Sequence, residues 1–319
     1  MSVQRLAGID IGTLTCRLLI ADLPPSGPLT ELYSERRILR LGEGVDQSKR
    51  LKPEAMDRVT RCLGEWRRII DTYHVHSRIA VATSAVRDAL NRQEFLDRVK
   101  SETDMEVEIL TGEEEARRTM LGIRSGLPPG ITDVLALDIG GGSTEFIFVL
   151  QGRSPIVRSI DFGVVRLSER LLHHDPPTSE EIRRARDWIR SETEQALAGF
   201  PRAAGTTFVG TAGTITSLAA MAQQLPAYEP ARIHNYRLSL DTIADLEQQL
   251  LTRTKAQRVG MPGLEKNRED VIAAGAIILR TVMETLDEEI CLVSDLGLRE
   301  GVLIELAMRN SRESPLRSP

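Results

Sequence analysis

Two segments of the chain, 128 positions apart (138 minus 10), share one plan. Residues 8–21 (GIDIGTLTCRLLIA) and 136–149 (ALDIGGGSTEFIFV) each consist of an apolar strand, an Asp-Ile-Gly turn with small residues, and a second apolar strand. The spacing is about one domain length. The repeat predicts an internal duplication, with two related domains whose turns at Asp10 and Asp138 open onto one cleft. Two unrelated hairpins with common turn residues are the alternative.

The chain is long enough for two domains, since it has 319 residues of which 41% are hydrophobic and 27% charged. Strands alternate with periodic helical segments, and Leu-Pro-Pro-Gly at 127–130 interrupts them. The predicted division is 1–127 and 128–298, with a helix at 299–312 that completes the first domain and a disordered tail at 313–319. Longer helices are expected over 53–73, 113–121, 179–197, 214–223, 241–251 and 267–286.

The bulk composition indicates a cytoplasmic protein. No apolar run approaches the ~20 residues that a membrane helix needs, and the start lacks the apolar core of a signal peptide. The three cysteines form no close pair, which fits a reducing compartment. No block of like charge suggests a nucleic-acid-binding tail. The net charge of −5 does not exclude a polyanionic substrate, because net charge reports on solubility more than on a site.

The segment DIGGGST at 138–144 is the strongest local signal for ligand binding. Three consecutive glycines at a strand end let the backbone approach a ligand and direct several N–H groups at one point. Ser143 and Thr144 add hydroxyl groups, and Asp138 can hold Mg²⁺ directly or through its waters. The segment predicts a phosphate cradle that is not a P-loop, since no GxxxxGK[ST] pattern occurs. A plain glycine hairpin is the alternative.

Several motifs, in chain order, resemble the exopolyphosphatase / guanosine pentaphosphate phosphohydrolase family, in its short two-domain form, within the actin/sugar-kinase superfamily. The resemblance implies an α/β fold of two actin-like (ribonuclease H-like) domains facing each other across a cleft. It also implies hydrolysis of the terminal phosphate of linear polyphosphate with Mg²⁺, or Mn²⁺ as an alternative. The matching motifs are DIGT (10–13), RILRLGEGVD (37–46), ATSAVRDA (82–89), TGEEEAR (111–117), DIGGGSTE (138–145), DFGVVRLSE (161–169), GTAGT (210–214) and VSDLGLREG (293–301).

The three adjacent glutamates of TGEEEAR have separable roles. Thr111 followed by Glu114 fits a capping box, and Glu113 lies in the first helical turn, where the helix dipole favours acids. Glu115 needs neither role and matches the family's catalytic carboxylate. The resemblance therefore implies that Glu115 is the general base that positions and deprotonates the attacking water. A third dipole-favoured acid is the alternative.

The resemblance implies further site residues around the two turns. Asp10, Asp138 and Glu145 are the expected metal ligands, and the last two join Glu115 in the expected catalytic set. Periodicity leaves open the face to which Glu145 points. Leu14 stands where the family commonly has Asn, which removes a polar contact to substrate. The expected substrate-binding residues are Thr13, Thr15, Arg17, Arg40, Thr83, Arg87, Gly140, Gly141, Gly142, Ser143, Thr144 and Arg268.

Four functions stay open at this stage. The first is an exopolyphosphatase, and the second is a guanosine pentaphosphate 5′-phosphohydrolase of the stringent response. A sugar- or acetate-type kinase would need an adenosine pocket around 210–214 and an Asp base. A non-catalytic polyphosphate or alarmone sensor, or a filament-forming actin relative, would not need the acids listed above. The expected partners are polyphosphate or guanosine pentaphosphate; a homodimer is allowed, and neither nucleic acid nor membrane is expected.

Overall fold

The computed structural model describes residues 3–200 and 205–313. The chain divides into two compact units. Unit 1 comprises Met1–Gly126 and Leu296–Pro319, and unit 2 comprises Leu127–Asp295. The chain thus returns to unit 1 with its last helix, α13 (Leu298–Glu313). The predicted tail at 313–319 lies outside the described residues from 314 onward, and its first residue is still helical.

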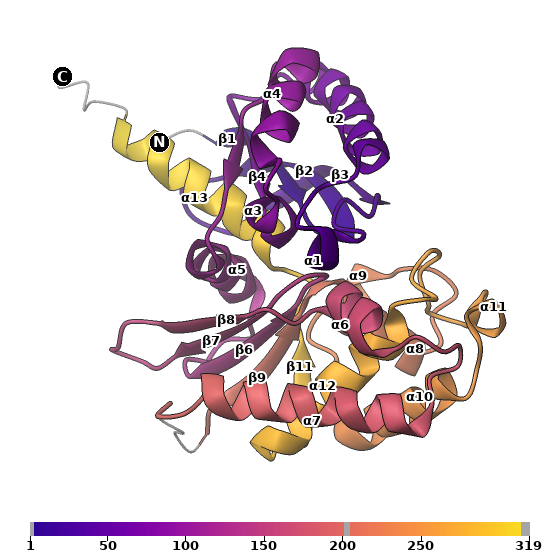
Figure 1. The fold of residues 1–319 in the computed structure, drawn as a ribbon. Helices are drawn as coiled ribbons and strands as arrows, with labels where there is room; N and C mark the ends of the chain where they lie inside the picture. The colour runs from indigo at the N-terminus through magenta and orange to yellow at the C-terminus, as the bar shows by residue number, and fades with distance from the viewer. Residues whose placement is uncertain (1–2, 201–204, 314–319) are drawn as a thin grey trace, which may run out of the picture. The chain divides into compact units, whose positions relative to one another are not determined.

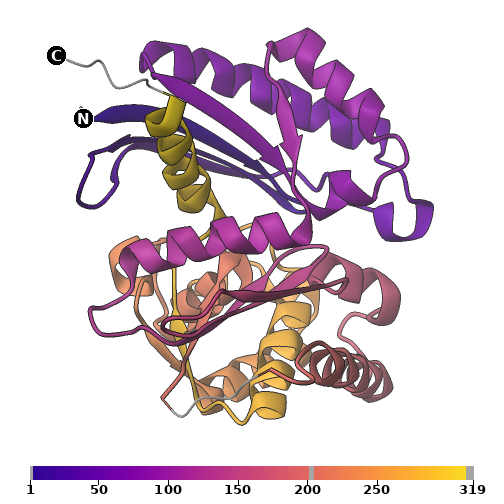
Figure 2. The same cartoon turned by 90° about the vertical axis from the view of Figure 1, so that its left-hand side faces the viewer.

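Unit 1 is built on a five-stranded sheet of order β3-β2-β1-β4-β5. β1, β2 and β3 are antiparallel neighbours, whereas β4 and β5 continue parallel to β1. α2 and α4 pack on one face of the sheet, and α13 packs on the other (Figures 1 and 2). The elements are β1 (Gln4–Ile11), β2 (Thr15–Leu23), β3 (Thr30–Ile38), α1 (Val45–Ser48), α2 (Pro53–Thr72), β4 (Ser77–Ala82), α3 (Ser84–Asp88), α4 (Arg92–Thr103), β5 (Val107–Ile109) and α5 (Gly112–Gly126).

Unit 2 is built on a six-stranded sheet of order β10-β11-β9-β6-β7-β8. α7 and α12 lie against one face (Figure 1). Leu135 and Phe148 of the sheet line a small pocket there together with Leu197 and Leu286. The elements are β6 (Val134–Ile139), β7 (Thr144–Val149), β8 (Ile156–Ile160), α6 (Val164–Leu171), α7 (Ser179–Ala196), β9 (Thr207–Thr211), α8 (Ala212–Ala222), α9 (Pro230–Ile233), β10 (Arg237–Ser239), α10 (Leu240–Leu251), α11 (Lys255–Arg258), α12 (Ile272–Leu286) and β11 (Ile290–Val293).

Five strands of each sheet follow the same topology. The order β8-β7-β6-β9-β11 in unit 2 matches β3-β2-β1-β4-β5 in unit 1, with the same parallel and antiparallel neighbours. This is the strand order of the actin-like, ribonuclease H-like sheet, so the predicted α/β fold class is confirmed. In the described residues, no helix combines the length and apolarity needed to cross a membrane.

Two sequence-based element assignments need correction. The helix predicted over 267–286 begins at Ile272, because Asn267 has a left-handed φ of 71° and the following residues form turns. The helix predicted over 113–121 continues to Gly126. β8, α6 and β10 were not predicted, since each is short and its apolar pattern is too brief to show a period.

α5 and α13 cross in close contact at two glycines within unit 1. A Cβ atom at Gly301 would lie 1.6 Å from the carbonyl oxygen of Arg118, and one at Gly122 would lie 1.9 Å from that of Gly297. Arg118, which is 1% exposed, also forms ion pairs with Glu305 of α13 and with Glu108 of β5. The last helix therefore fixes the position of α5.

We expect Gly301→Ala to lower the free energy of unfolding by about 1–3 kcal/mol, because the added methyl group would overlap backbone atoms that cannot rotate away. The matched control is Gly64→Ala in α2, where the nearest atom to a new Cβ, Thr103 Cγ2, is 3.9 Å away. That variant should gain about 0.5–1 kcal/mol from helix propensity. Urea unfolding of both variants measures the difference, and equal effects would contradict the close helix crossing.

Candidate active site

The two glycine turns have the same local geometry. The N–H of Gly12 donates to the carbonyl of Thr15 at 3.0 Å, and the N–H of Gly140 donates to that of Ser143 at 3.0 Å. A Cβ atom at Gly12 or Gly140 would lie 2.9 or 3.0 Å from the same carbonyl oxygen. Glycine is therefore needed at the first position of each turn, directly after a strand that carries an aspartate at its end.

The turn of unit 2 is held from one side by α6. The N–H groups of Val164 and Val165 donate to the carbonyls of Gly140 and Gly141 at 3.0 and 2.9 Å. A Cβ atom at Gly163 would lie 2.5 Å from Gly141, so this contact also requires glycine. In a trans peptide the carbonyl and the next N–H point in opposite directions. The N–H groups of the second and third glycines of the turn therefore point away from α6, as a phosphate cradle requires.

The two hydroxyl residues of this turn are deeply buried. The Thr144 hydroxyl donates to the carbonyl of Phe162 at 2.7 Å, and the side chain is 0% exposed. This hydrogen bond ties β7 to the residue before Gly163. Ser143 is 2% exposed. In this structure the Thr144 hydroxyl has a structural partner, so its expected contact with substrate stays a prediction.

Asp138 and Glu145 face each other across β6 and β7. They are register partners in an antiparallel pair, so both side chains project from the same face of the sheet. Asp138 is 8% and Glu145 1% exposed, and Ser159 Oγ of β8 donates to Glu145 Oε1 at 2.8 Å. Periodicity had left the direction of Glu145 open, and the register places it with Asp138. Two like charges directly opposite each other are destabilising, and a bound cation would relieve this cost.

The structure separates the three glutamates at the start of α5. Glu113 is exposed. Glu114 Oε2 accepts from the Thr111 N–H at 2.9 Å, and the Glu114 N–H donates to Thr111 Oγ1 at 3.2 Å, so the predicted capping box is confirmed. The hydrogen bonds from Thr111, its backbone N–H first, lower the pKa of Glu114. Glu115 is buried, and Arg87 Nη1 donates to its Oε2 at 3.2 Å.

The first turn, the start of α3 and the loop after β3 converge within unit 1. Thr13 Oγ1 lies 2.8 Å from Ser84 Oγ, and a Cβ atom at Gly42 would lie 2.3 Å from Thr13 Cγ2. The N–H of Arg40 donates to the Leu14 carbonyl at 2.9 Å, and Arg40 has a left-handed φ of 53°. The Leu14 side chain is buried, and its backbone carbonyl holds this loop through the hydrogen bond from Arg40. Thr15, the first residue of β2, and Thr83, which follows β4, are buried in the same region.

Arg268 reaches the GTAGT segment of unit 2. Its guanidinium lies 2.3–2.9 Å from the place a Cβ atom would take at Gly213, so a side chain at position 213 would displace it from this conformation. The side chain is buried, and Nε donates to Glu265 Oε2 at 2.5 Å. The backbone of Ala212, with a φ of 71°, turns sharply at the same point. The structure thus places Arg268 at the third glycine motif of unit 2.

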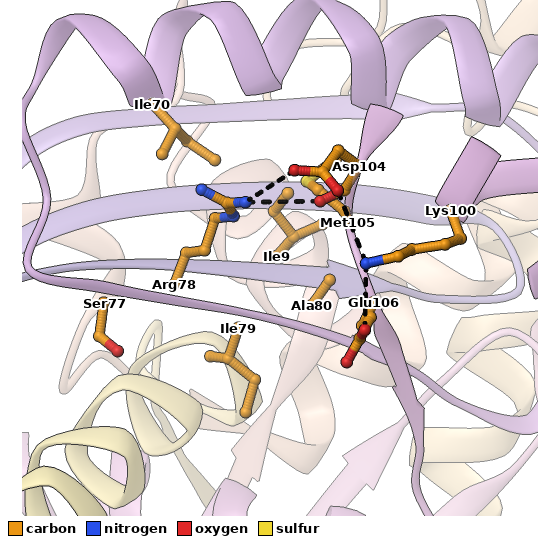
Figure 3. Close-up of a pocket in the computed structure, with 10 residues that line it drawn as sticks. All are labelled: Ile9, Ile70, Ser77, Arg78, Ile79, Ala80, Lys100, Asp104, Met105 and Glu106. Carbon is orange, nitrogen blue, oxygen red and sulfur yellow. Dashed lines mark hydrogen bonds and ion pairs between the residues drawn. The ribbon is translucent and has the colours of Figure 1, made fainter. Parts of the chain in front are cut away.

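A pocket of about 400 Å³ in unit 1 lies away from these residues (Figure 3). It opens at the start of β4, whereas Thr83 follows the end of that strand. The charged groups at its rim are paired with each other, Arg78 with Asp104 at 3.7 Å and Lys100 with Glu106 at 3.0 Å. None of the predicted site residues lines it. It therefore lies at the opposite end of the strand from the glycine turn.

The donor groups fit a hard divalent cation. Within the described ranges 3–200 and 205–313, no three His, Cys, Asp or Glu side chains form a set that could hold a metal ion alone. Mg²⁺ commonly binds through only one or two carboxylates together with waters and substrate phosphates. The pair Asp138 and Glu145 matches that pattern.

These features define a class of protein. The chain has two actin-like sheets. In each, two strands are joined by a glycine turn, and an aspartate lies near the end of the first strand. Unit 1 also has a buried glutamate at the start of a helix. Backbone N–H groups at such turns form anion-binding concavities. The fold and the paired turns together are those of the actin-like class.

Comparison with known proteins gives the family. A model of the Ppx/GppA phosphatase family matches residues 19–310. Exopolyphosphatase 2 of Mycobacterium tuberculosis is 36% identical over 321 residues, which cover 96% of this chain and 100% of that protein. Crystal structures of the Aquifex aeolicus Ppx/GppA family member (34% identity, TM-score 0.82, 97% and 99% coverage) and of an exopolyphosphatase from Cytophaga hutchinsonii (30%, 0.87, 96% and 98%) are similar. The chain belongs to the Ppx/GppA phosphatase family, and the family assignment from its motifs is confirmed.

Proposed function

We propose that this chain is an exopolyphosphatase, which hydrolyses the terminal phosphate of linear polyphosphate and releases orthophosphate. The observation that carries the proposal is the burial of Glu115 and its contact with Arg87. Glu115 is the one of three adjacent glutamates that is buried, that takes no part in the capping box, and that Arg87 orients. The relative that is 36% identical to this chain is named an exopolyphosphatase, and the match covers its whole length. This supports polyphosphate as the substrate class.

In this reaction Glu115 accepts a proton from the attacking water. The water oxygen then bonds to the terminal phosphorus, and the bridging oxygen leaves with the shortened chain. The N–H groups of Gly141 and Gly142, which point away from α6, would donate to phosphate oxygens. Arg87, which contacts Glu115, is the proposed ligand of a phosphate oxygen beside the base. Phosphoryl transfer to water requires positioning and charge neutralisation, and these residues provide both without a covalent nucleophile.

The proposed cofactor is Mg²⁺, with Mn²⁺ as an alternative. Asp138 and Glu145 would hold it in unit 2, and Asp10 is the proposed ligand from unit 1. When bound, the ion neutralises charge on the terminal phosphate. The protein's part is to keep the acid pair in register, through the β6–β7 pairing and the hydrogen bond from Ser159.

Guanosine pentaphosphate is the second candidate substrate. Its terminal phosphate is joined by the same kind of phosphoanhydride bond, so the same base and cradle would serve.

Phosphate release from long polyphosphate, tripolyphosphate, guanosine pentaphosphate and ATP, measured in parallel with Mg²⁺, tests the proposal. We expect the highest kcat/KM for polyphosphate, because each of its units offers the charges that the arginines and glycine N–H groups bind. A higher value for guanosine pentaphosphate would assign the second function instead. Binding without release from any of the four would indicate a sensor.

A further inference from the structure

A pocket of about 210 Å³ lies in unit 2 between the sheet and the C-terminal ends of α7 and α12 (the α7–α12 pocket). Its apolar wall consists of Leu135, Phe148, Leu197, Phe200 and Leu286. An apolar cavity of roughly 150 Å³ lined by leucine, isoleucine and phenylalanine stays dry and binds benzene. The α7–α12 pocket is thus large enough for one aromatic ring with a small substituent.

Two phenylalanines form the aromatic side of this pocket. The N–H of Phe200 donates to the Leu197 carbonyl at 3.0 Å, so the chain turns back after α7 and carries the Phe200 ring to the sheet. The ring centroids of Phe148 and Phe200 lie 5.9 Å apart with an interplanar angle of 63°, which is an edge-to-face contact. A third aromatic ring in the pocket would extend the same kind of contact.

Thr193 adds a buried hydroxyl group to the wall. Its side chain is 0% exposed, and its Oγ1 has no hydrogen-bond partner in the part of the chain that the structure describes. Thr285, the other threonine of the pocket, differs because its hydroxyl donates to the Thr281 carbonyl at 2.7 Å. A buried hydroxyl without a partner costs free energy. A buried water commonly makes about three hydrogen bonds, more than these two hydroxyl groups offer, so an organic ligand with one polar atom fits better.

The pocket lies on the face of the sheet opposite the acid pair. Leu135 and Phe148 are register partners on β6 and β7, as are Asp138 and Glu145. Leu135 is three positions before Asp138, and side chains alternate between the two faces along a strand, so the two pairs project from opposite faces. A ligand in the pocket would therefore leave the proposed metal site open.

We propose that the α7–α12 pocket is a second binding site, which takes a small aromatic molecule that carries one hydroxyl or carbonyl group. The ring packs against the phenylalanines and leucines of the wall, and the polar atom forms a hydrogen bond with Thr193 Oγ1. This inference goes beyond the proposed function, because such a molecule is neither a substrate nor a product of phosphate release. It binds at the same time as polyphosphate.

Titration of the protein with para-fluorophenol and with fluorobenzene, followed by fluorine NMR, tests the site. Both probes should bind the wild type. Thr193→Val should weaken binding of para-fluorophenol about fivefold, the value of one neutral hydrogen bond. Valine keeps the shape of the side chain, so the affinity for fluorobenzene should stay the same. The matched control is Thr252→Val, directly after α10: the Thr252 hydroxyl donates to the Gln248 carbonyl outside the pocket, and neither affinity should change.

Two further measurements locate the probes. Leu197→Trp fills the pocket from a half-buried position in its wall and should weaken binding of both probes. Saturating tripolyphosphate should leave both affinities unchanged, because the pocket and the acid pair lie on opposite faces of the sheet. Unchanged affinity of Thr193→Val for para-fluorophenol, absence of binding by the wild type, or displacement of the probes by tripolyphosphate would each overturn the proposal.

Discussion

The Glu115→Gln variant is expected to hydrolyse polyphosphate with a kcat about 10²–10⁴-fold below that of the wild type, the usual contribution of general acid–base catalysis. Glutamine keeps the shape of the side chain but cannot accept the proton of the attacking water. Substrate binding should change much less, because a neutral side chain repels the polyanion less than a carboxylate does. Steady-state phosphate release gives kcat, and binding measurements without turnover give the affinity.

The neighbouring capping residues are the matched controls. Glu114→Gln keeps an acceptor for the Thr111 N–H and should have nearly wild-type kcat. Thr111→Ala loses the hydroxyl that accepts from the Glu114 N–H, and should lower stability by about 1 kcal/mol while it spares turnover. If Glu115 were only another acid favoured by the helix dipole, its substitution would affect melting and leave kcat unchanged. A fully active Glu115→Gln would assign the water to another group, with Glu145 as the next candidate.

The Asp138→Asn variant is expected to lose about 100-fold or more in activity at low Mg²⁺, because it removes a carboxylate from the proposed cation site. The structure adds a second expectation that does not depend on activity. Since Asp138 faces Glu145 directly, removal of one charge relieves repulsion in the metal-free protein. The melting temperature of the variant in EDTA should therefore equal or exceed that of the wild type. Addition of Mg²⁺ should raise it less than it raises that of the wild type.

Asp187→Asn is the control for this experiment. Asp187 lies on α7 of the same unit and accepts from Arg183 on the protein surface, so its loss removes one carboxylate that is not among the proposed site residues. We expect wild-type activity and a wild-type response to Mg²⁺. An Asp138→Asn protein that needs no more Mg²⁺ than the wild type would remove Asp138 from the metal site.

The sequence predicted the fold well because the fold repeats. The two Asp-Ile-Gly segments identified equivalent strands, and the alternation of predicted strands and helices around them indicated α/β units. The capping box at Thr111 was also predictable, since it depends on residues three positions apart. The short strand β8 and the irregular residues before Ile272 were not, because neither has a hydrophobic period of its own. The cleft between the two domains stays a prediction.

The motifs of the candidate site were predictable from the sequence, but the pairing of its residues across neighbouring strands was not. The glycine turns, Glu115 and Asp138 are marked by local sequence. The direction of Glu145 depends on pairing with β6, and Ser159 enters only through β8. Strand register depends on the hydrophobic patterns of both strands and on the turn between them, so it was not read from one strand alone. Ser159 lies outside the glycine turns and was therefore missed.

The lengths of the products formed from long polyphosphate with Mg²⁺ test the central claim most directly. Removal of terminal phosphates predicts that orthophosphate appears from the first time point while the remaining chains shorten gradually. EDTA, or the Glu115→Gln substitution, should stop both changes. Fragments of intermediate length without orthophosphate, or equal orthophosphate release in EDTA, would contradict the account.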